Sequence, residues 1–273
     1  MPDTTKLPNV TLLHGHRIPA LGFGTWQLAE GEETETAVAA AIKAGYRLID
    51  TAKIYGNETS VGLAINSSGI ARDEIFITTK LWNSDHGYDQ AIKAIEGSLE
   101  RLGLSEVDLY LIHWPGKDNV GSWKALIDIH KQKGGAKAIG VSNFTPDDLE
   151  EIISATGVVP AVNQIEFHPF VYDNQLPTLN YCNDKGIVVE AYSPLARGNQ
   201  LSNTLLKQIA KEHEKTSAQV MLRWAIQHGT VPIPKSSHPE RIKQNLQIFC
   251  FELSHEQMEA INNLSEGKTA LPL

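Results

Sequence analysis

The stretch IFITTKLWNSDHGYDQAIKAIEGSLERLGLSEVDLYLIH, residues 75–113, holds two short apolar segments on either side of an amphipathic one. We predict strands at Ile75–Thr79 and Val107–Ile112, because short, almost continuously apolar runs are typical of strands covered on both faces. Between them, Gln90–Leu102 carries apolar residues at helical spacing and is followed by Gly103, a residue type that commonly terminates helices. The order strand, helix, strand predicts two parallel strands joined by a helical crossover.

The same alternation of short apolar runs and helix-like segments continues along the chain. Thr34–Ala44 and Ser217–His228 resemble further helices, and Thr145–Ser154 begins with a capping Thr, a Pro and two acids, which favour a helix start. Eight parallel strands can close into a barrel. We therefore predict an α/β protein, a single-domain (β/α)8 TIM barrel over residues 1–273. The predicted strands are Leu21–Gly24, Arg47–Ile49, Ile75–Thr79, Val107–Ile112, Ala138–Val141, Ala161–Ile165, Ile187–Ala191 and Val231–Ile233.

Two features lie outside the eightfold repeat. The segment VTLLHGHRIPAL, residues 10–21, precedes the first predicted strand and is typical of a β-hairpin with a turn at His14-Gly15. We expect this hairpin to cover the bottom of the barrel. Extra helices are also expected, one in the pair between the seventh and eighth strands and one at Ser254–Leu264.

Composition and charge argue against several classes of function. The 273 residues carry a formal net charge of −8, which disfavours nucleic acid or an anionic membrane as the main partner. Cys182 and Cys250 are too few for a disulfide framework and form no C-x-x-C motif, so a reducing, cytoplasmic location is expected. The first residues lack the apolar core of a signal peptide, and no run approaches the roughly 18 apolar residues of a membrane span.

Polar side chains stand at the ends of three consecutive predicted strands. Asp50 follows the second strand in LIDTAKIYGNE, residues 48–58, and Tyr55 lies in the loop after it. Lys80 ends the third strand and His113 ends the fourth. The carboxyl ends of barrel strands share one face, where barrel enzymes have their active sites, so the four side chains are expected to lie together. A structural alternative stays open, with Asp50 and Lys80 as a buried ion pair and His113 as a core histidine.

These four residue types suit proton transfer to a carbonyl oxygen. A nearby ammonium favours the phenolate, so Lys80 is expected to lower the pKa of Tyr55 and make it a proton donor near neutral pH. Asp50 would hold Lys80 in place and balance its charge. His113 would orient the carbonyl group. The nucleophile that completes such a reduction is a hydride, which a protein takes from a nicotinamide cofactor.

Six motifs in a fixed order resemble those of the aldo-keto reductases: IDTAKIYGNE, TTKLWN, LIHWP, IGVSNF, NQIEFHP and IPKS. The resemblance covers nearly the whole chain and is greatest to the microbial diketogluconate and glyoxal reductase branch. It implies a monomeric (β/α)8 barrel that reduces small carbonyl compounds and prefers NADPH to NADH. It also implies a catalytic tetrad, with Tyr55 as the proton donor, that consists of Asp50, Tyr55, Lys80 and His113.

The resemblance further implies the residues that hold the cofactor, since no G-x-G-x-x-G fingerprint occurs. Ser142, Asn143 and Gln164 would bond the nicotinamide carboxamide. Tyr192 would stack on its ring, and the loop that begins at Ser193 would fold over the pyrophosphate. Without the resemblance, these residues would be read as loop caps and a rim aromatic. The complete implied set is Gly24, Thr25, Asp50, Ser142, Asn143, Gln164, Tyr192, Ser193, Leu195, Lys235, Ser236, Arg241, Gln244 and Asn245.

A basic segment, PKSSHPERIKQN at residues 234–245, follows the last predicted strand. Lys235, Ser236 and Arg241 bring two cations and a hydroxyl to a helix start, which suits a phosphate group. The resemblance assigns this segment to the adenosine 2′-phosphate and the adenine, with Gln244 and Asn245 nearby. A solvated charged surface is the alternative interpretation.

Three of the five tryptophans, Trp26, Trp82 and Trp114, stand just beyond predicted strands on the same face. With Tyr55 and His113 they would line an apolar substrate pocket, although general packing is the alternative. The loop after the fourth strand and the C-terminal segment are short. In longer members of the family that the chain resembles, these two regions build the pocket, so the resemblance implies that the pocket is open here and accepts small aldehydes, dicarbonyls, and keto acids or esters.

Other functions fit the sequence less well than carbonyl reduction. Tyr181 and Lys185 match Y-x-x-x-K, the pair of the short-chain dehydrogenases, but they read as part of an ordinary helix. The ten histidines show no metal-ligand spacing, so no metal is expected. A nicotinamide-binding regulatory or scaffold protein on the same barrel is one alternative. A barrel lyase that uses Lys80 as a Schiff base is another.

Overall fold

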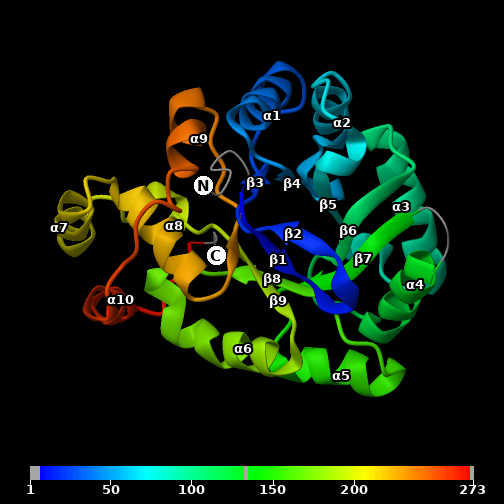
Figure 1. Cartoon of the computed structure of the whole chain (residues 1–273). Helices are drawn as coiled ribbons and strands as arrows, with labels where there is room; N and C mark the ends of the chain where they lie inside the picture. The colour runs from blue at the N-terminus through cyan, green and yellow to red at the C-terminus, as the bar shows by residue number, and fades with distance from the viewer. Residues whose placement is uncertain (1–6, 132–134, 271–273) are drawn as a thin grey trace.

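Eight parallel strands form the central sheet of the computed structural model, which describes residues 7–131 and 135–270 (Figure 1). Every neighbouring pair in this sheet is parallel, and the spatial order follows the order along the chain from β3 to β10. The strands are β3 (Phe23–Gly24), β4 (Leu48–Asp50), β5 (Phe76–Leu81), β6 (Glu106–Ile112), β7 (Gly135–Ser142), β8 (Val162–Glu166), β9 (Val188–Tyr192) and β10 (Val231–Pro232).

The first and last strands close the sheet into a barrel. The backbone N–H of Gly22 donates to the carbonyl of Pro232 at 3.0 Å, and that of Gly24 donates to Pro234 at 3.1 Å. A Cβ atom on Gly24 would lie 2.8 Å from the carbonyl oxygen of Ile233, so only glycine permits this approach. The predicted barrel is confirmed.

The two strands at the closure are shorter than the sequence predicts. We expected Leu21–Gly24 and Val231–Ile233, whereas the regular ladders cover only Phe23–Gly24 and Val231–Pro232. Prolines at 232 and 234 have no N–H to donate, so each accepts a hydrogen bond from β3 or its flank without returning one. At this seam between the first and last strands, Pro232 and Pro234 therefore accept hydrogen bonds from the β3 side but donate none.

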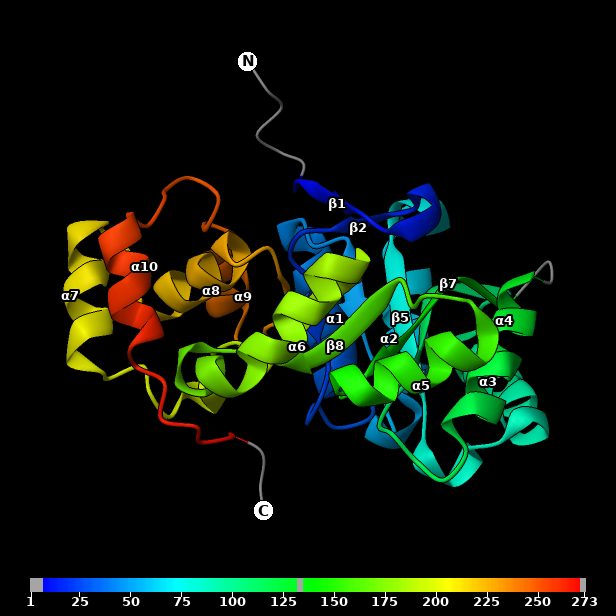
Figure 2. The same ribbon diagram turned by 90° about the horizontal axis from the view of Figure 1, so that it is seen from below.

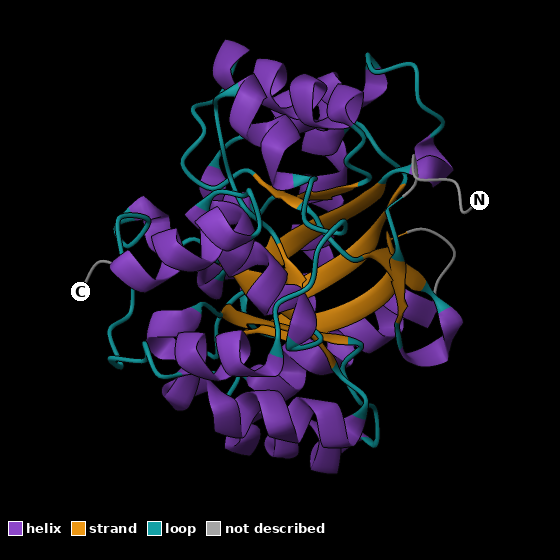
Figure 3. Ribbon diagram, turned by 60° about the vertical axis from the view of Figure 1, so that its left-hand side comes forward, coloured by secondary structure: helices purple, strands orange, loops and turns teal. Residues whose placement is uncertain are grey.

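Helices surround the barrel on its outer side (Figure 3). The predicted extra helices are confirmed as the pair α7 and α8 before β10 and as α10 near the end. The described helices are α1 (Glu32–Ala44), α2 (Glu58–Asn66), α3 (Tyr88–Leu102), α4 (Asn119–Lys131), α5 (Pro146–Thr156), α6 (Tyr172–Lys185), α7 (Thr204–Glu212), α8 (Ser217–Gln227), α9 (Pro239–Asn245) and α10 (His255–Asn262).

Local sequence signals set the ends of these helices. Thr145 caps α5 by accepting from the N–H of Asp148, whose side chain accepts in return from the N–H of Thr145. Gly45 and Gly103 follow α1 and α3 at φ angles of 118° and 63°, the left-handed region in which glycine is favoured. Among the described helices, none is long and apolar enough to cross a membrane.

The N-terminal hairpin covers the bottom of the barrel, as predicted. Strands β1 (Asn9–Thr11) and β2 (Arg17–Pro19) pair in antiparallel fashion on either side of a short helical turn at Leu13–Gly15. Ile18 packs inside the barrel in one cluster with Leu48 and Phe76, which lie at the N-terminal ends of β4 and β5. Figure 2 shows the hairpin on one side of the barrel. The predicted functional side chains lie at the opposite end of the barrel, where the strands have their C-terminal ends.

Candidate functional site

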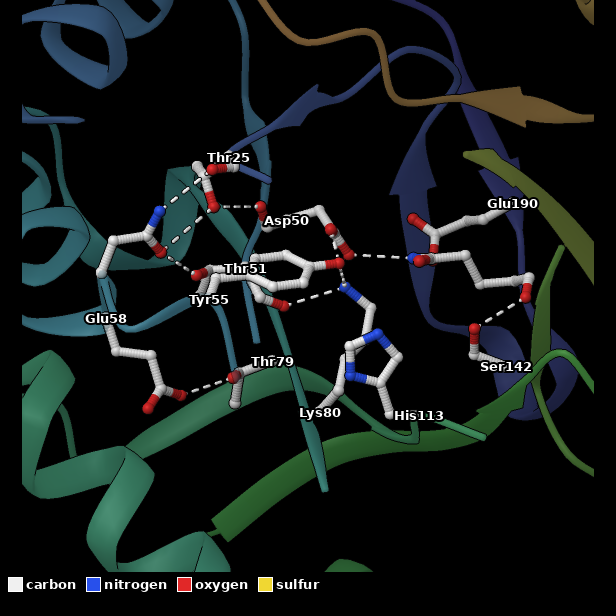
Figure 4. Close-up of polar contacts among 12 residues, drawn as sticks. Thr25, Asp50, Thr51, Tyr55, Glu58, Thr79, Lys80, His113, Ser142 and Glu190 are labelled. Carbon is white, nitrogen blue, oxygen red and sulfur yellow. Dashed lines mark hydrogen bonds and ion pairs between the residues drawn. The ribbon is translucent and has the colours of Figure 1, made fainter. Parts of the chain in front are cut away.

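Four polar side chains meet at the C-terminal end of the strands, as the sequence predicts. Asp50 is the last residue of β4, Lys80 lies in β5, and His113 follows β6. Tyr55 ends a short 3-10 turn, Lys53–Tyr55, in the loop after β4. Figure 4 shows their side chains converging around the Lys80 ammonium.

Lys80 is the centre of this group. Its Nζ donates to Asp50 Oδ1 at 2.7 Å, to the carbonyl of Thr51 at 2.9 Å and to the Tyr55 hydroxyl oxygen at 3.2 Å. Lys80 is 0% exposed and Asp50 is 2% exposed. All three ammonium hydrogens therefore have an acceptor, which is the condition under which a buried lysine keeps its charge.

The direction of the Tyr55 pKa differs from the expectation. Lys80 does act to lower it, as predicted. Burial of the phenol is the larger effect, and together with the negative charges of Asp50 and Glu190 it leaves the pKa of Tyr55 above its ordinary value. The sequence could not show this burial. Tyr55 is consequently a protonated phenol at neutral pH, beside an ammonium that can stabilise its phenolate.

Lys80 and His113 are each held in a definite charge state. Burial opposes the charge on Lys80, but Asp50 and Tyr55 outweigh it and raise the pKa of the lysine above its ordinary value. Burial, and secondarily Lys80, holds the pKa of His113 well below its ordinary value. Lys80 is thus an ammonium and a poor amine nucleophile, which disfavours the Schiff-base lyase, and His113 is a neutral imidazole at pH 7.

Aromatic side chains form the wall beside Tyr55 and His113. The Trp26 ring centroid lies 4.9 Å from that of Tyr55, and Trp82 lies edge-on to His113 at 5.2 Å. Trp114 lines the same cavity. The three predicted tryptophans are therefore gathered at one place, and Trp26 keeps 42% of its surface exposed.

One cavity of about 1130 Å³ joins the aromatic wall to the basic segment after β10. Its lining includes Asp50, Tyr55 and His113, and also every predicted cofactor residue except Thr25. Thr25 is fully buried, and its hydroxyl donates to the carbonyl of Asp50 at 2.9 Å. The structure thus places Thr25 beneath the site, as a support for the loop after β4.

Predicted nicotinamide residues are linked to one another across the lining. Ser142 Oγ donates to the carbonyl of Gln164 at 2.8 Å, and Asn143 Nδ2 donates to the carbonyl of His113 at 3.0 Å. The hydroxyl of Tyr192 donates to Asn143 Oδ1 at 2.8 Å. These bonds tie the ends of β6, β7, β8 and β9 into one polar surface.

The loop after β9 has an unusual backbone. Ser193, Ala196 and Arg197 adopt φ angles of 48°, 46° and 55°, which each cost roughly 1–3 kcal/mol for a residue other than glycine. All of this loop from Ser193 to Gly198 except Ala196 lines the cavity. Arg197 lies here and was not among the predicted residues. The sequence alone does not show that its guanidinium group reaches the cavity, because this depends on the path of the loop.

At the far end of the cavity lie Lys235, Ser236, Arg241, Gln244 and Asn245. Among residues 7–131 and 135–270, neither Lys235 nor Arg241 forms an ion pair. The hydroxyl of Ser236 accepts from the N–H of His238 at 3.1 Å at the start of α9. Two uncompensated cations at a helix start are suited to an anionic group.

Comparison with known proteins shows the family of this chain. The model of the family described as Aldo/keto reductase family matches residues 20–266. The chain belongs to the aldo/keto reductase family. Among its relatives, the glyoxal reductase of Bacillus subtilis (strain 168) is 49% identical over 271 residues, which cover 99% of this chain and 95% of that protein.

Solved structures of the aldo/keto reductase family have the same fold. An aldo/keto reductase from Brucella melitensis superposes with a TM-score of 0.90 at 48% identity, covering 95% of this chain and 100% of the other. The Bombyx mori aldo-keto reductase, solved in complex with NADP, superposes with a TM-score of 0.92 at 35% identity, covering 98% and 96% of the two chains.

Besides Arg197, two further residues of this aldo/keto reductase were not predicted from the sequence. Asn57 is fully buried; its Nδ2 donates to the carbonyls of Thr25 and Leu28 at 3.0 and 3.1 Å, and its Oδ1 accepts from Thr51 at 2.8 Å. It thereby joins the loop after β3 to the loop after β4, which carries Tyr55. Glu190 of β9 is the second; it is an acid inside an otherwise apolar strand sequence, which was the available signal.

Proposed function

We propose that the protein reduces small aldehydes, dicarbonyls and ketones to alcohols, with NADPH as cofactor and Tyr55 as proton donor. The observation that carries this proposal is the Tyr55 hydroxyl 3.2 Å from the buried Lys80 ammonium on the floor of a large cavity. Membership of the aldo/keto reductase family supports carbonyl reduction. The similarity to a glyoxal reductase supports small dicarbonyl substrates.

The cavity suits NADPH by its size and by the chemistry of its two ends. Amide and hydroxyl groups stand near Tyr55, and Lys235 and Arg241, which form no ion pair with the described residues, stand at the far end. Ser142, Asn143 and Gln164 would hold the carboxamide, and the basic segment would hold the 2′-phosphate. When bound, the reduced nicotinamide would supply a hydride. A structural relative solved in complex with NADP supports NADP(H) as the cofactor.

The protein's own groups would then stabilise charge on the carbonyl oxygen. Tyr55 carries the proton that this oxygen needs, because its pKa is above the ordinary value. As the proton leaves, the phenolate forms beside the Lys80 ammonium, whose own charge Asp50 balances at 2.7 Å. Neutral His113, with its ring 5.6 Å from that of Tyr55, can donate a hydrogen bond to the same oxygen.

The aromatic wall supports small substrates. Trp26, Trp82 and Trp114 surround the approach to Tyr55 and present apolar surface to the carbon chain of the substrate. Lys53, in the loop that carries Tyr55, does not line the cavity and forms an ion pair with Asp85. Recognition of the substrate would therefore depend on shape and on the carbonyl group itself.

The test is Tyr55→Phe, assayed with NADPH and methylglyoxal by the loss of NADPH absorbance. We expect at least about a hundredfold loss of kcat, the lower end for general acid catalysis, with NADPH binding retained. The matched control is Tyr181→Phe, the tyrosine of the Y-x-x-x-K alternative. Its hydroxyl contacts Glu150 on the outer surface, so this variant should keep wild-type kcat.

Two results would overturn the proposal. If Tyr55→Phe matches wild type, the proton comes from another group. If the wild-type protein binds NADPH but reduces no member of a broad aldehyde and ketone panel, the regulatory or scaffold function is favoured. Loss of activity in Tyr181→Phe alone would favour the short-chain dehydrogenase pair.

A further inference from the structure

Glu190 is a buried acid that the tetrad does not use. It lies in β9 opposite Gln164 of β8 and Val231 of β10, and it is 0% exposed. Its Oε1 atom has no hydrogen-bond partner among the described residues. In Figure 4, Glu190 lies on the side of Asp50 away from the Tyr55 ring. A carboxyl group with an unsatisfied oxygen inside a barrel core is costly and calls for a specific explanation.

Gln164 connects Glu190 to the tetrad. Its Nε2 donates to Asp50 Oδ2 at 2.9 Å and to Glu190 Oε2 at 3.1 Å. Because the Asp50 carboxylate can only accept, the amide turns its NH2 group toward the two carboxyl groups and its oxygen away, and a neutral Glu190 accepts through its carbonyl oxygen. Within the part of the chain that the structure describes, that amide oxygen accepts no hydrogen bond, and Gln164 lines the cavity. The Gln164 amide oxygen can therefore accept a hydrogen bond from a ligand in the cavity.

Glu190 and Asp50 are two carboxyl groups under the influence of the same ammonium group, that of Lys80. The titratable groups that act on Glu190 are Asp50 of β4 and Lys80 of β5, and Glu190 in turn acts on Tyr55. The adjacent strands β8 and β10 face it with neutral Gln164 and apolar Val231. One ammonium thus serves two carboxyl groups. Burial first, and then Asp50, raises the pKa of Glu190 to about 8, so it is a neutral acid at pH 7.

We propose that Glu190 is a positioning residue, whose carboxyl group fixes the Gln164 amide with its oxygen toward the cavity and leaves Asp50 as the sole carboxylate paired with Lys80. This inference rests on the proposed function, since it concerns how Gln164 meets the nicotinamide carboxamide. Glu190 acts through Gln164 and Asp50 and does not itself line the cavity. Ionisation of Glu190 would add a second negative charge beside Asp50 and make Tyr55 a weaker acid.

Two variants separate this role from simple filling of the barrel core. Glu190→Gln keeps the shape and an acceptor for Gln164 but removes the titration. Glu190→Met keeps approximate volume and removes the acceptor, so the Gln164 amide is held by Asp50 alone. Core filling predicts changes in unfolding temperature without any change in the pH profile. The exposed acid Glu252, paired with Arg223, provides the control variant Glu252→Gln.

The first measurement does not depend on activity. Infrared difference spectra between wild type and Glu190→Gln should show the carbonyl stretch of a protonated carboxylic acid at pH 7. In wild type this band should disappear as the pH rises through about 8. Absence of the band at pH 7 would mean that Glu190 is ionised, and the proposal would fail. The Glu252→Gln difference spectrum should lack the band.

The second measurement compares pH profiles of kcat with methylglyoxal and NADPH. A group with a pKa of about 8 is about nine-tenths ionised at pH 9. The ratio of Glu190→Gln activity to wild-type activity should therefore rise by up to about tenfold between pH 7 and pH 9. Superimposable profiles would overturn the proposal. Glu190→Met should weaken NADPH binding severalfold, as followed by fluorescence titration; unchanged binding would also contradict it.

Failure of the proposed function would give a different pattern. If wild type reduces no carbonyl compound, the reductase proposal falls, and the infrared band together with NADPH binding by Glu190→Met still decides the role of Glu190. If wild type is active and the two profiles coincide, the reductase stands and the positioning role falls.

Discussion

Lys80 Nζ lies 3.2 Å from the Tyr55 hydroxyl oxygen, at a point where the lysine has no exposed surface. Burial of the lysine reduces the screening of this contact by water, so the ammonium acts more strongly on the phenol than it would at the surface. Burial keeps the phenol protonated, and the ammonium stabilises the phenolate that remains after proton donation. The two residues therefore act as one acid whose strength depends on their separation.

Lys80→Met should remove this stabilisation. We expect kcat for carbonyl reduction to fall by at least about a hundredfold. The variant also leaves Asp50 as a buried, unpaired carboxylate, which should lower the free energy of unfolding by about 3–5 kcal/mol. Stopped-flow measurement of NADPH oxidation and urea unfolding test the two effects separately.

A double variant and a control separate catalysis from folding. Asp50→Asn in the Lys80→Met background removes the unpaired charge, so stability should recover while activity should not. Lys137→Met removes a lysine that pairs with Asp108 at 3.0 Å, away from the cavity, and should leave kcat unchanged. Recovery of activity in the double variant would show that Lys80 acts only through stability.

Arg241→Gln should discriminate between the two nicotinamide cofactors. Arg241 lines the far end of the cavity and forms no ion pair among the described residues, so its charge is available for the 2′-phosphate. A hydrogen bond to a charged group contributes about 1.5–3 kcal/mol, so the Kd for NADPH should rise about 10- to 100-fold. The Kd for NADH should change little. Fluorescence titration measures both.

Lys243→Gln is the matched control for this prediction. Lys243 stands two residues further along the same helix, α9, and is exposed without lining the cavity. Both variants lose one positive charge, so a general electrostatic effect would weaken NADPH binding equally in the two. Equal effects, or equal losses for NADPH and NADH in Arg241→Gln, would refute a specific phosphate contact.

Some site residues could be predicted from the sequence because the C-terminal ends of all barrel strands lie on one face. Asp50, Lys80 and His113 each end an apolar strand, and parallel strands bring their carboxyl ends together whatever the loops do. This rule needs only strand boundaries, which are readable from short apolar runs. The hairpin turn and the glycine helix ends were readable for a similar reason, since each depends on neighbouring residues alone.

Other features depend on contacts between distant segments. The upward direction of the Tyr55 pKa comes from its burial and from Glu190, a residue far away along the chain. The hydrogen bonds that run in one direction at the seam follow from prolines that happen to face β3. The role of Asn57 requires the loops after β3 and β4 to lie side by side. None of these contacts has a local sequence signature.

Asn57→Ala should destabilise the loop that carries Tyr55. The variant leaves the carbonyls of Thr25 and Leu28 without their donor in a buried place. Each unsatisfied group costs about 1–3 kcal/mol, so for two groups the free energy of unfolding should fall by about 2–6 kcal/mol. Because the same loop positions Tyr55, kcat should fall as well. Urea unfolding and steady-state kinetics measure the two changes.

Asn66→Ala provides the comparison, since Asn66 is an exposed residue at the end of α2. It should change the free energy of unfolding by no more than about 0.5 kcal/mol. If Asn57→Ala is as mild as Asn66→Ala, its hydrogen bonds contribute little and Tyr55 must be positioned by other contacts.

Glu166 at the end of β8 should make the anchoring of the C-terminal segment dependent on pH. Burial alone would raise the pKa of Glu166, but hydrogen bonds from His168, Thr269 and the N–H of Ala270 outweigh it and hold the pKa below its ordinary value. A carboxyl group of this kind contributes stability above its unfolded pKa, and that stability is lost as the pH falls through the folded pKa.

Thr269→Val removes one of the donors, so the folded pKa of Glu166 should move up toward its ordinary value. At pH 7 the variant should be less stable than wild type by about 1–2 kcal/mol. The difference should shrink in acid, because protonation of Glu166 removes the charge that the hydroxyl stabilises in wild type. Thr36→Val, at an exposed position of α1, should show no such pH dependence. A Thr269→Val difference that is the same at every pH would mean that the hydroxyl stabilises the segment through packing and not through the Glu166 charge.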